Sequence, residues 1–196
     1  MSKIEQNKEK KKGAIIQAAQ DVFLSEGYVL ASMDKIAAQA QVTKQTIYRY
    51  YPSKVDLFKA TLEQMGESSE VSFLAHLQEP DVKEALYKFA KGFIQAHLSN
   101  EHLATLRLLV AESSKAPEMI SSFCAVGPDE TEAKLSEFFS ERLAIKNAAT
   151  TVLLWTAMLL AHRATVLIGM ERPDDQQIEQ HARDATNFLL AAISWP

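Results

Sequence analysis

The chain has 196 residues, is 47% hydrophobic and carries a formal net charge of −4 at pH 7. This length predicts one large or two small domains, with ample apolar content for a core. The lysine-rich start lacks a following apolar segment, which argues against a cleavable signal peptide, and the single Cys124 excludes an internal disulfide. We therefore expect a protein of the reducing cytoplasm. Glycine and proline are few, with six of each, which suits long helices.

The first segment, residues 1–12, is polar and contains the basic cluster Lys8-Glu9-Lys10-Lys11-Lys12. Two interpretations stay open for it: a solvated tail, or an arm or first helical turn that touches phosphate or the minor groove of DNA. A helix then runs to about Ser25, and Gly27 ends it. The residues that this helix buries are Ile15, Ala19, Val22 and Phe23.

Residues 32–51 are predicted to form two short helices joined by a tight turn. Ser32 is a good N-cap for the first helix, and Asp34 in its first turn suits the helix dipole. Thr43 caps the second helix, which runs from Lys44 to about Tyr51. The apolar residues that face each other are Ile36, Ala37, Ala40 and Ile47. Two crossed helices of this kind form a helix-turn-helix, which places its second helix in the major groove of DNA.

The polar side chains of this segment fit a DNA contact. Those from Lys44 to Thr46 lie at the N-terminal end of the second helix, where side chains reach base edges. Tyrosine hydroxyls and the ammonium of Lys54 are common phosphate donors. Ser32, with the first amides of its helix, is expected to hold a phosphate. The predicted DNA-binding residues are Ser32, Thr43, Lys44, Gln45, Thr46, Tyr48, Tyr50 and Lys54. The alternative is an ordinary helical hairpin with a solvated charged face.

With its flanks, this segment resembles the N-terminal domain of the TetR family of transcriptional regulators. The matching residues are Ile15–Phe23, Gly27-Tyr28, Ser32, Lys35-Ile36-Ala37, Val42-Thr43, Ile47-Tyr48, Tyr51, Ser53-Lys54 and Leu57-Phe58. The match covers about the first third of the chain and is specific in order and spacing. One departure is Gln41, where the family usually has glycine. Glutamine at a positive φ costs roughly 1 kcal/mol or needs a different turn.

The charge distribution agrees with a DNA-binding head. Residues 1–65 hold ten Lys or Arg and seven Asp or Glu, whereas residues 66–196 hold eleven and eighteen. A basic head on an acidic body orients the head toward DNA, because the long-range field repels the body.

Beyond the helix-turn-helix, the pattern predicts further helices, about nine in all, and hence an all-α fold. A fourth helix is expected from Lys54 to Leu77 and a fifth from Asp81 to about Leu98. Asn100 is expected to cap the helix that follows. Pro117 suits the first turn of the next helix. Gly127-Pro128 either kinks that helix or ends it.

The most apolar stretch is Thr150–Met170, and His162 and Arg163 in its middle argue against a membrane span. A helix that is apolar on nearly all sides must be covered on most of them, so we expect contacts with its own subunit and with a second one. The last helix, about Asp174–Ser194, carries an apolar stripe and is expected to complete a four-helix dimer interface. The predicted interface residues are Trp155, Leu159, Val166, Ile178, Ala182, Ala185, Phe188 and Leu189. The alternative is a core within one chain alone.

No catalytic or metal-binding pattern is found in the sequence. The five histidines are scattered, one cysteine cannot build a Cys-rich zinc site, and no glycine-rich phosphate loop is present. We therefore predict no enzyme, no metal and no cofactor. The TetR resemblance implies a small effector among the C-terminal helices. The candidate effector residues are Phe93, His97, Arg107, Phe123, Trp155, Met158 and His162. For each of them, ordinary core packing is the alternative.

Together these observations predict a cytoplasmic homodimer that represses transcription by occupying a palindromic operator in double-stranded DNA. The expected organisation is a DNA-binding domain at residues 1–53, with its helix-turn-helix at 32–51, and an effector-binding and dimerisation domain at residues 54–196. An apolar or amphipathic small molecule is expected to release the DNA. The alternative is a DNA-bound adaptor of the same fold, whose partner is a protein and which has no small-molecule effector.

Overall fold

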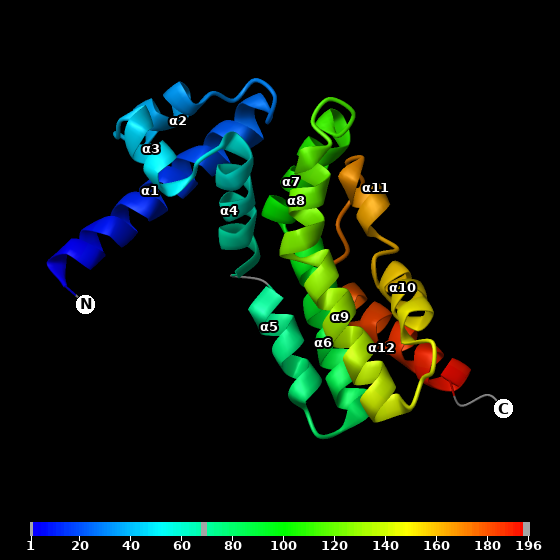
Figure 1. Cartoon of the computed structure of the whole chain (residues 1–196). Helices are drawn as coiled ribbons and strands as arrows, with labels where there is room; N and C mark the ends of the chain where they lie inside the picture. The colour runs from blue at the N-terminus through cyan, green and yellow to red at the C-terminus, as the bar shows by residue number, and fades with distance from the viewer. Residues whose placement is uncertain (1, 68–69, 194–196) are drawn as a thin grey trace. The chain divides into compact units, whose positions relative to one another are not determined.

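The computed structural model describes residues 2–67 and 70–193, and every regular element in these ranges is a helix (Figure 1). The all-α class predicted from the sequence is confirmed. The chain divides into two compact units. Unit 1 comprises Met1–Met65 and Ala104–Val126, and unit 2 comprises Gly66–Leu103 and Gly127–Pro196. Unit 1 therefore combines the predicted DNA-binding segment with a second, later stretch of chain.

Unit 1 begins with a long helix that includes the basic cluster. Its elements are α1 (Lys3–Glu26), α2 (Met33–Gln39), α3 (Lys44–Tyr50), α4 (Lys54–Glu67), α7 (Asn100–Glu112) and α8 (Glu118–Val126), and α4 and α7 extend past the limits of the unit. The N–H of Glu5 donates to Ser2 Oγ at 3.3 Å, and the N–H of Ser2 donates to Glu5 Oε2 at 2.7 Å. This capping box starts α1 ahead of the lysines. The basic cluster is thus helical and is not an unstructured tail.

The helix-turn-helix has the caps that the sequence predicts. The N–H of Lys35 donates to Ser32 Oγ at 3.2 Å, and the N–H of Thr46 donates to Thr43 Oγ1 at 3.1 Å. Between the two helices, Gln41 has a φ of 54° and so adopts the left-handed conformation that favours glycine. Ile47 is fully buried in the cluster that also contains the apolar residues of α2, and this contact fixes the rotation of α3.

Three aromatic rings lie at the centre of the unit 1 core. The ring centroids of Phe23, Tyr28 and Phe58 are 5.1 to 5.6 Å apart, with edge-on or tilted geometry. Side chains from α7, α8 and the loop between them complete this core, namely Leu108, Leu109, Ala116 and Met119. The head of the chain is therefore covered by residues that come much later in the sequence.

Glu112, at the end of α7, makes a second connection to the head. Its Oε2 accepts a hydrogen bond from the N–H of Val29 at 2.9 Å. The carboxylate lies directly against Gly27, which has a φ of 84°; a Cβ at Gly27 would come within 2.5 Å of a Glu112 oxygen. Glycine is therefore favoured here by the backbone conformation, whereas the carboxylate is the end of a flexible side chain that can shift.

Unit 2 is built around α6. Its elements are α5 (Glu70–Ala75), the 3-10 helix η1 (His76–Gln78), α6 (Val82–His97), α9 (Pro128–Leu143), α10 (Ala148–Leu159), α11 (Arg163–Leu167) and α12 (Asp175–Ile193). Helix α6 packs against α5 and α12, and α10 packs against α9 and α12. The large rings of its core are Phe73, Phe89, Phe93, Phe138, Phe139 and Trp155. Gly92 allows α5 to approach α6 closely, because a Cβ there would lie 2.8 Å from Phe73 Cβ.

One predicted long helix is divided in the structure, so that prediction was wrong, and another differs at its end. The helix expected from Lys54 to Leu77 contains α4 and α5 and ends in the 3-10 helix η1, and residues 68–69 of it lie outside the described residues. The apolar stretch Thr150–Met170 contains α10 and α11, with a turn between Leu159 and Arg163. Among the described residues, no helix has the length and apolar character needed to cross a membrane.

The helix ends further along the chain are a mixture of confirmed and corrected predictions. Asp81 caps α6 as expected, since its Oδ1 accepts from the N–H of Glu84 at 2.8 Å. Asn100 is not the cap of α7, because Ser99 Oγ accepts the N–H of His102 at 3.2 Å. Gly127 ends α8, and Pro128 is the first residue of α9, which resolves the choice between a kink and an end.

Candidate DNA interface

The burial of Ile47 determines which side of α3 faces away from the core. Lys44, Gln45, Tyr48 and Arg49 are exposed, and Tyr50 is half-buried. The side chains predicted to contact DNA thus lie on the free side of the helix. No interaction of the Gln45 amide is found within the described part of the chain, so this group is available to hydrogen-bond a base edge.

Lys44 already has an acidic neighbour. Its Nζ lies 2.8 Å from Asp34 Oδ2, and this hydrogen bond raises the pKa of Lys44 above its ordinary value. Both side chains are largely exposed, so the pair contributes little to stability and a stronger anion can replace it. Thr43 has a local role, because its Oγ1 accepts the N–H of Thr46 and so caps α3. The Thr46 hydroxyl lies 2.8 Å from that oxygen and is free to turn to another partner, since the contact is exposed. Among the predicted DNA-binding residues, Thr43 therefore stabilises the start of α3.

Lys54 is bound inside unit 1 instead of extending to solvent. Its ammonium donates to the carbonyl oxygens of Tyr28, Val29 and Ala31 at 2.8, 3.3 and 3.2 Å. The same nitrogen lies 4.5 Å from the centroid of the Tyr28 ring. An ammonium has three donors, and all three have acceptors here. The geometry therefore favours a structural role for Lys54 over the phosphate contact that we expected.

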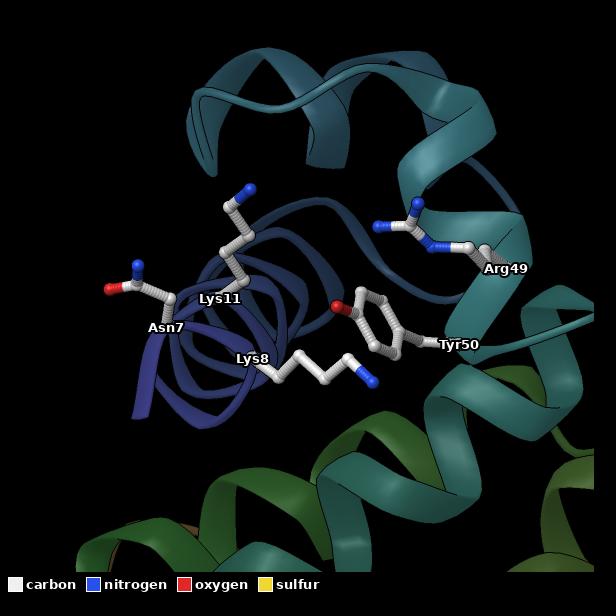
Figure 2. Close-up of a pocket in the computed structure, with 5 residues that line it drawn as sticks. All are labelled: Asn7, Lys8, Lys11, Arg49 and Tyr50. Atoms are coloured by element: carbon white, nitrogen blue, oxygen red, sulfur yellow. The ribbon is translucent and has the colours of Figure 1, made fainter. Parts of the chain in front are cut away.

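A cavity of about 560 Å³ lies between the first turns of α1 and the end of α3. It is lined by Asn7, Lys8 and Lys11 from α1 and by Arg49 and Tyr50 from α3. Figure 2 shows Lys8 extending toward Tyr50 and Lys11 extending upward from α1, with the Arg49 guanidinium and the Tyr50 hydroxyl extending from α3 toward α1. We call this feature the α1–α3 pocket. Sequence reasoning placed only Tyr50 of these five among the site residues, although the lysine cluster and Arg49 were the signal for the others.

The predicted effector residues are divided between the two units. Arg107 and Phe123 belong to unit 1, whereas the other five belong to unit 2. His162 is exposed, and Phe93 and Trp155 are buried in the aromatic core. The rings of Phe89 and Phe139 lie 5.6 and 5.7 Å from that of Trp155. The buried Nε1 of Trp155 has no hydrogen-bond partner among the described residues.

His97 and His102 form a half-buried pair in unit 2, with ring centroids 4.5 Å apart. Burial, with a smaller contribution from the nearby His102, lowers the pKa of His97 to about 3. Burial also lowers the pKa of His102 to about 4, with a smaller contribution from Arg163. His97 Nδ1 lies 2.8 Å from the Phe93 carbonyl oxygen, which can only accept, so the neutral ring carries its proton on Nδ1.

Most of the predicted dimer-interface residues face the interior of their own unit. Seven of the eight are buried in the unit 2 core: Trp155, Leu159, Val166, Ile178, Ala182, Ala185 and Leu189. Only Phe188 is exposed, at 65%. Assigning the seven buried residues to a surface for a second subunit was therefore wrong, because they are already covered within one chain. No group of three His, Cys, Asp or Glu side chains that could hold a metal ion is found in the described ranges.

Comparison with known proteins agrees with this geometry. Residues 15–61 match the model of the bacterial regulatory proteins of the TetR family, and residues 84–193 match that of the C-terminal domain of AefR-like transcriptional repressors. The chain is 23% identical over 190 residues to the transcriptional repressor Rv3405c of Mycobacterium tuberculosis. This match covers 96% of this chain and 93% of Rv3405c. It is 38% identical over 56 residues to the transcriptional activator FasR of Mycolicibacterium smegmatis, covering 29% of this chain and only 26% of FasR.

Solved structures have the same fold along nearly the whole chain. The flavonoid-responsive regulator FrrA superposes with a TM-score of 0.79 at 27% identity, covering 93% of this chain and 96% of FrrA. A transcriptional regulator from Mesorhizobium loti superposes with a TM-score of 0.76 at 22% identity, covering 98% of each chain. The two family models together account for both the helix-turn-helix and the helices of unit 2. The chain belongs to the TetR family of helix-turn-helix transcriptional regulators.

Proposed function

We propose that this protein is a dimeric, cytoplasmic repressor that occupies a palindromic operator and leaves it when a small effector binds to unit 2. The observation that carries the proposal is the rotation of α3, in which buried Ile47 turns the polar side chains outward. In a major groove, Lys44, Gln45 and Thr46 contact base edges, and Tyr48 and Tyr50 contact phosphates. The repressor name of the full-length relative Rv3405c supports the direction of regulation.

A dimer interface on unit 2 is supported by apolar side chains that the chain itself leaves exposed. Leu153 and Leu154 on α10 are 68% and 62% exposed, and Phe188 on α12 is 65% exposed. These two helices pack against each other, and exposed alanines surround the three large residues. The same face on a second copy forms an isologous four-helix contact, and a dimer carries two copies of α3, one for each half-site of a palindrome. Members of the family bind DNA and act as dimers.

An effector site in unit 2 is supported by the unpartnered indole of Trp155. A buried N–H without an acceptor is costly, and the oxygen of a ligand would satisfy it. The neighbouring rings of Phe89, Phe93 and Phe139 favour an apolar or aromatic molecule. The name of FrrA, a flavonoid-responsive regulator, points to the same chemical class. Such a ligand acts only if it binds more tightly to a state in which the two α3 helices no longer fit adjacent grooves.

The test begins with selection of operator sequences from random duplex DNA by the purified protein. We expect a palindrome whose half-sites are about 10 base pairs apart, or a multiple of this spacing. Gln45→Ala should lose roughly 1–3 kcal/mol of affinity, mainly at one base pair of each half-site. If selection enriches no sequence, a specific repressor function is ruled out.

The effector is then sought by titrating aromatic acids, flavonoids, acyl compounds and cationic drugs into the protein–operator complex. Ligand and operator should each weaken the binding of the other by the same factor, because coupling between sites is reciprocal. Binding of a compound should also change the fluorescence of Trp155, measured in a Trp195→Phe background. If no class of compound binds while the operator is still recognised, the protein is instead a DNA-bound adaptor with a protein partner.

A further inference from the structure

The α1–α3 pocket is a convergent arrangement of donors, because its residues come from two helices that meet there. Lys8 and Lys11 are one turn apart on α1 and so lie on the same face, and Asn7 is one turn before Lys11. Arg49 and Tyr50 are in the last turn of α3, next to the residues that contact bases. The Arg49 guanidinium lies 5.2 Å from the centroid of the Tyr50 ring. The helical start of α1 therefore brings its lysines to the end of the recognition helix.

The positive charge in this pocket is unopposed. In the described part of the chain, no ion pair joins Lys8, Lys11 or Arg49 to a carboxylate. Other lysines of unit 1 are neutralised: Lys12 lies 3.3 Å from Glu9, and Lys44 is paired with Asp34. Three cations around one cavity repel one another, and this repulsion is relieved when an anion enters. The pocket is therefore suited to an anionic ligand.

The polar groups of the lining favour an anion over a metal cation. Lys8, Lys11, Arg49 and Asn7 end in nitrogen-bearing groups and Tyr50 ends in a hydroxyl, and these polar ends stand on aliphatic stems and an aromatic ring. No carboxylate lines the pocket, so a metal cation is disfavoured. Lysine and arginine with neutral amide and hydroxyl donors are the typical partners of phosphate oxygens. A volume of about 560 Å³ is large enough for a sugar–phosphate segment.

We propose that the α1–α3 pocket binds the DNA backbone beside the half-site that α3 reads, with Lys8, Lys11 and Arg49 holding its phosphates. The proposal rests on the DNA-binding function and on the continuity of the pocket with the exposed side of α3. A recognition helix in the major groove has a phosphate backbone along each side, and the lysines of α1 extend the contact beyond the helix-turn-helix. This contact carries no sequence information and strengthens binding to all DNA equally.

The decisive experiment is the salt dependence of DNA binding by Lys8→Ala/Lys11→Ala. We expect the slope of log K against log salt concentration to decrease in magnitude by roughly 3.6 for the dimer, because four phosphate contacts are lost, two per subunit, and each accounts for roughly 0.9. Affinity should fall by the same factor on the selected operator and on random duplex DNA. The matched control is Lys10→Ala/Lys12→Ala, which removes the same charge from the same helix outside the pocket and should change the slope less.

Two further measurements locate the contact. Ethylation of individual backbone phosphates should interfere with operator binding by the wild type, and the interference at phosphates flanking each half-site should disappear in Lys8→Ala/Lys11→Ala. Arg49→Gln should remove interference at the same phosphates. Circular dichroism of every variant confirms that α1 remains helical, as alanine favours.

Several outcomes would overturn the proposal. Equal slope changes in both double variants would assign the effect to a diffuse basic field, and unchanged slopes in both would remove α1 from the interface. Pyrophosphate binding that requires Lys8 and Lys11, with operator affinity unaffected by their loss, would identify a site for a free anion. If the wild type selects no DNA sequence, the proposed repressor function fails, whereas normal selection by the pocket variant with an unchanged slope refutes only the pocket.

Discussion

Gln41 is held in a backbone conformation that most residues avoid, with a φ of 54° in the turn between α2 and α3. The left-handed region costs an ordinary residue about 1–2 kcal/mol, part of which glycine recovers. We expect Gln41→Gly to stabilise the protein by roughly 1 kcal/mol in urea unfolding. Ala144, with a φ of 53° at the end of α9, should respond in the same way. Ala38→Gly, inside α2, is the control and should destabilise by about 1 kcal/mol.

One substitution distinguishes a structural role of Lys54 from a role in binding phosphate. If its ammonium holds the carbonyls of Tyr28, Val29 and Ala31, then Lys54→Met should lower the unfolding free energy by roughly 2 kcal/mol without DNA present. Lys59→Met is the control on the same helix, since Lys59 is exposed and its ion pair with Glu63 is long, at 4.0 Å. Unchanged stability, together with a salt slope reduced by about two for the dimer, one phosphate contact per subunit, would restore the phosphate role.

Local chemistry explains which residue-level features the sequence could predict. The N-caps Ser32 and Thr43 were predictable, because each hydroxyl accepts a hydrogen bond from a backbone N–H only three positions later in the chain. The left-handed Gln41 was anticipated because the matching position in the family is glycine. The role of Lys54 was not predictable, because its acceptors lie 23 to 26 positions earlier in the chain and become neighbours only through the packing of unit 1.

On the scale of the helix, α12 shows how one element divides its apolar residues between two partners. Ala185 is 6% exposed within unit 2, whereas Phe188, one turn later, is 65% exposed. Phe188→Glu should therefore give a folded monomer in sedimentation, with weaker operator binding, because it alters only the proposed interface. Ala185→Glu should unfold unit 2, because it buries a charge in a closed core. A folded dimer with Phe188→Glu would place the interface elsewhere.

The periodicity of α12 predicted its stripe correctly but not what covers it. Spacing shows which side chains share a face, and burial within one chain or between two chains leaves the same pattern. Helix division was missed for a related reason. No proline interrupts Thr150–Met170, and the turn after Leu159 allows the short helix α11 to form on its own axis. The DNA-binding surface could be predicted further than the unit 2 site, because the former is one contiguous motif and the latter draws on several helices.

At the scale of the whole molecule, the half-buried histidines predict loss of stability in mild acid. In the unfolded chain, imidazoles bind protons below a pH of about 6.5, whereas folded His97 and His102 do so only near pH 3 and 4. Between these values the unfolded state binds more protons, so stability falls as pH decreases from about 6.5 toward 4 and is unaffected above this range. The loss is at most about 1.4 kcal/mol per pH unit for each imidazole.

This pH dependence is measured by urea unfolding at several pH values between 7.5 and 4.5. The decline should be smaller for His97→Gln and His102→Gln, which remove the imidazole from its half-buried position. His162→Gln serves as the control, because that ring is exposed. A decline of the same size in all three variants would assign the acid sensitivity to other groups.

The two parts of unit 1 leave the ribosome at different times, because they are far apart in the sequence. Roughly sixty residues of chain separate the end of the first segment at Met65 from the end of the second at Val126. At a synthesis rate of about 5–20 residues per second, the newly made head waits roughly 3–12 s for the side chains of α7 and α8. During that interval Phe23 and Phe58 lack part of their cover, which makes the nascent chain a substrate for chaperones. A gene fragment ending at codon 65 would therefore encode a head that never acquires its complete core.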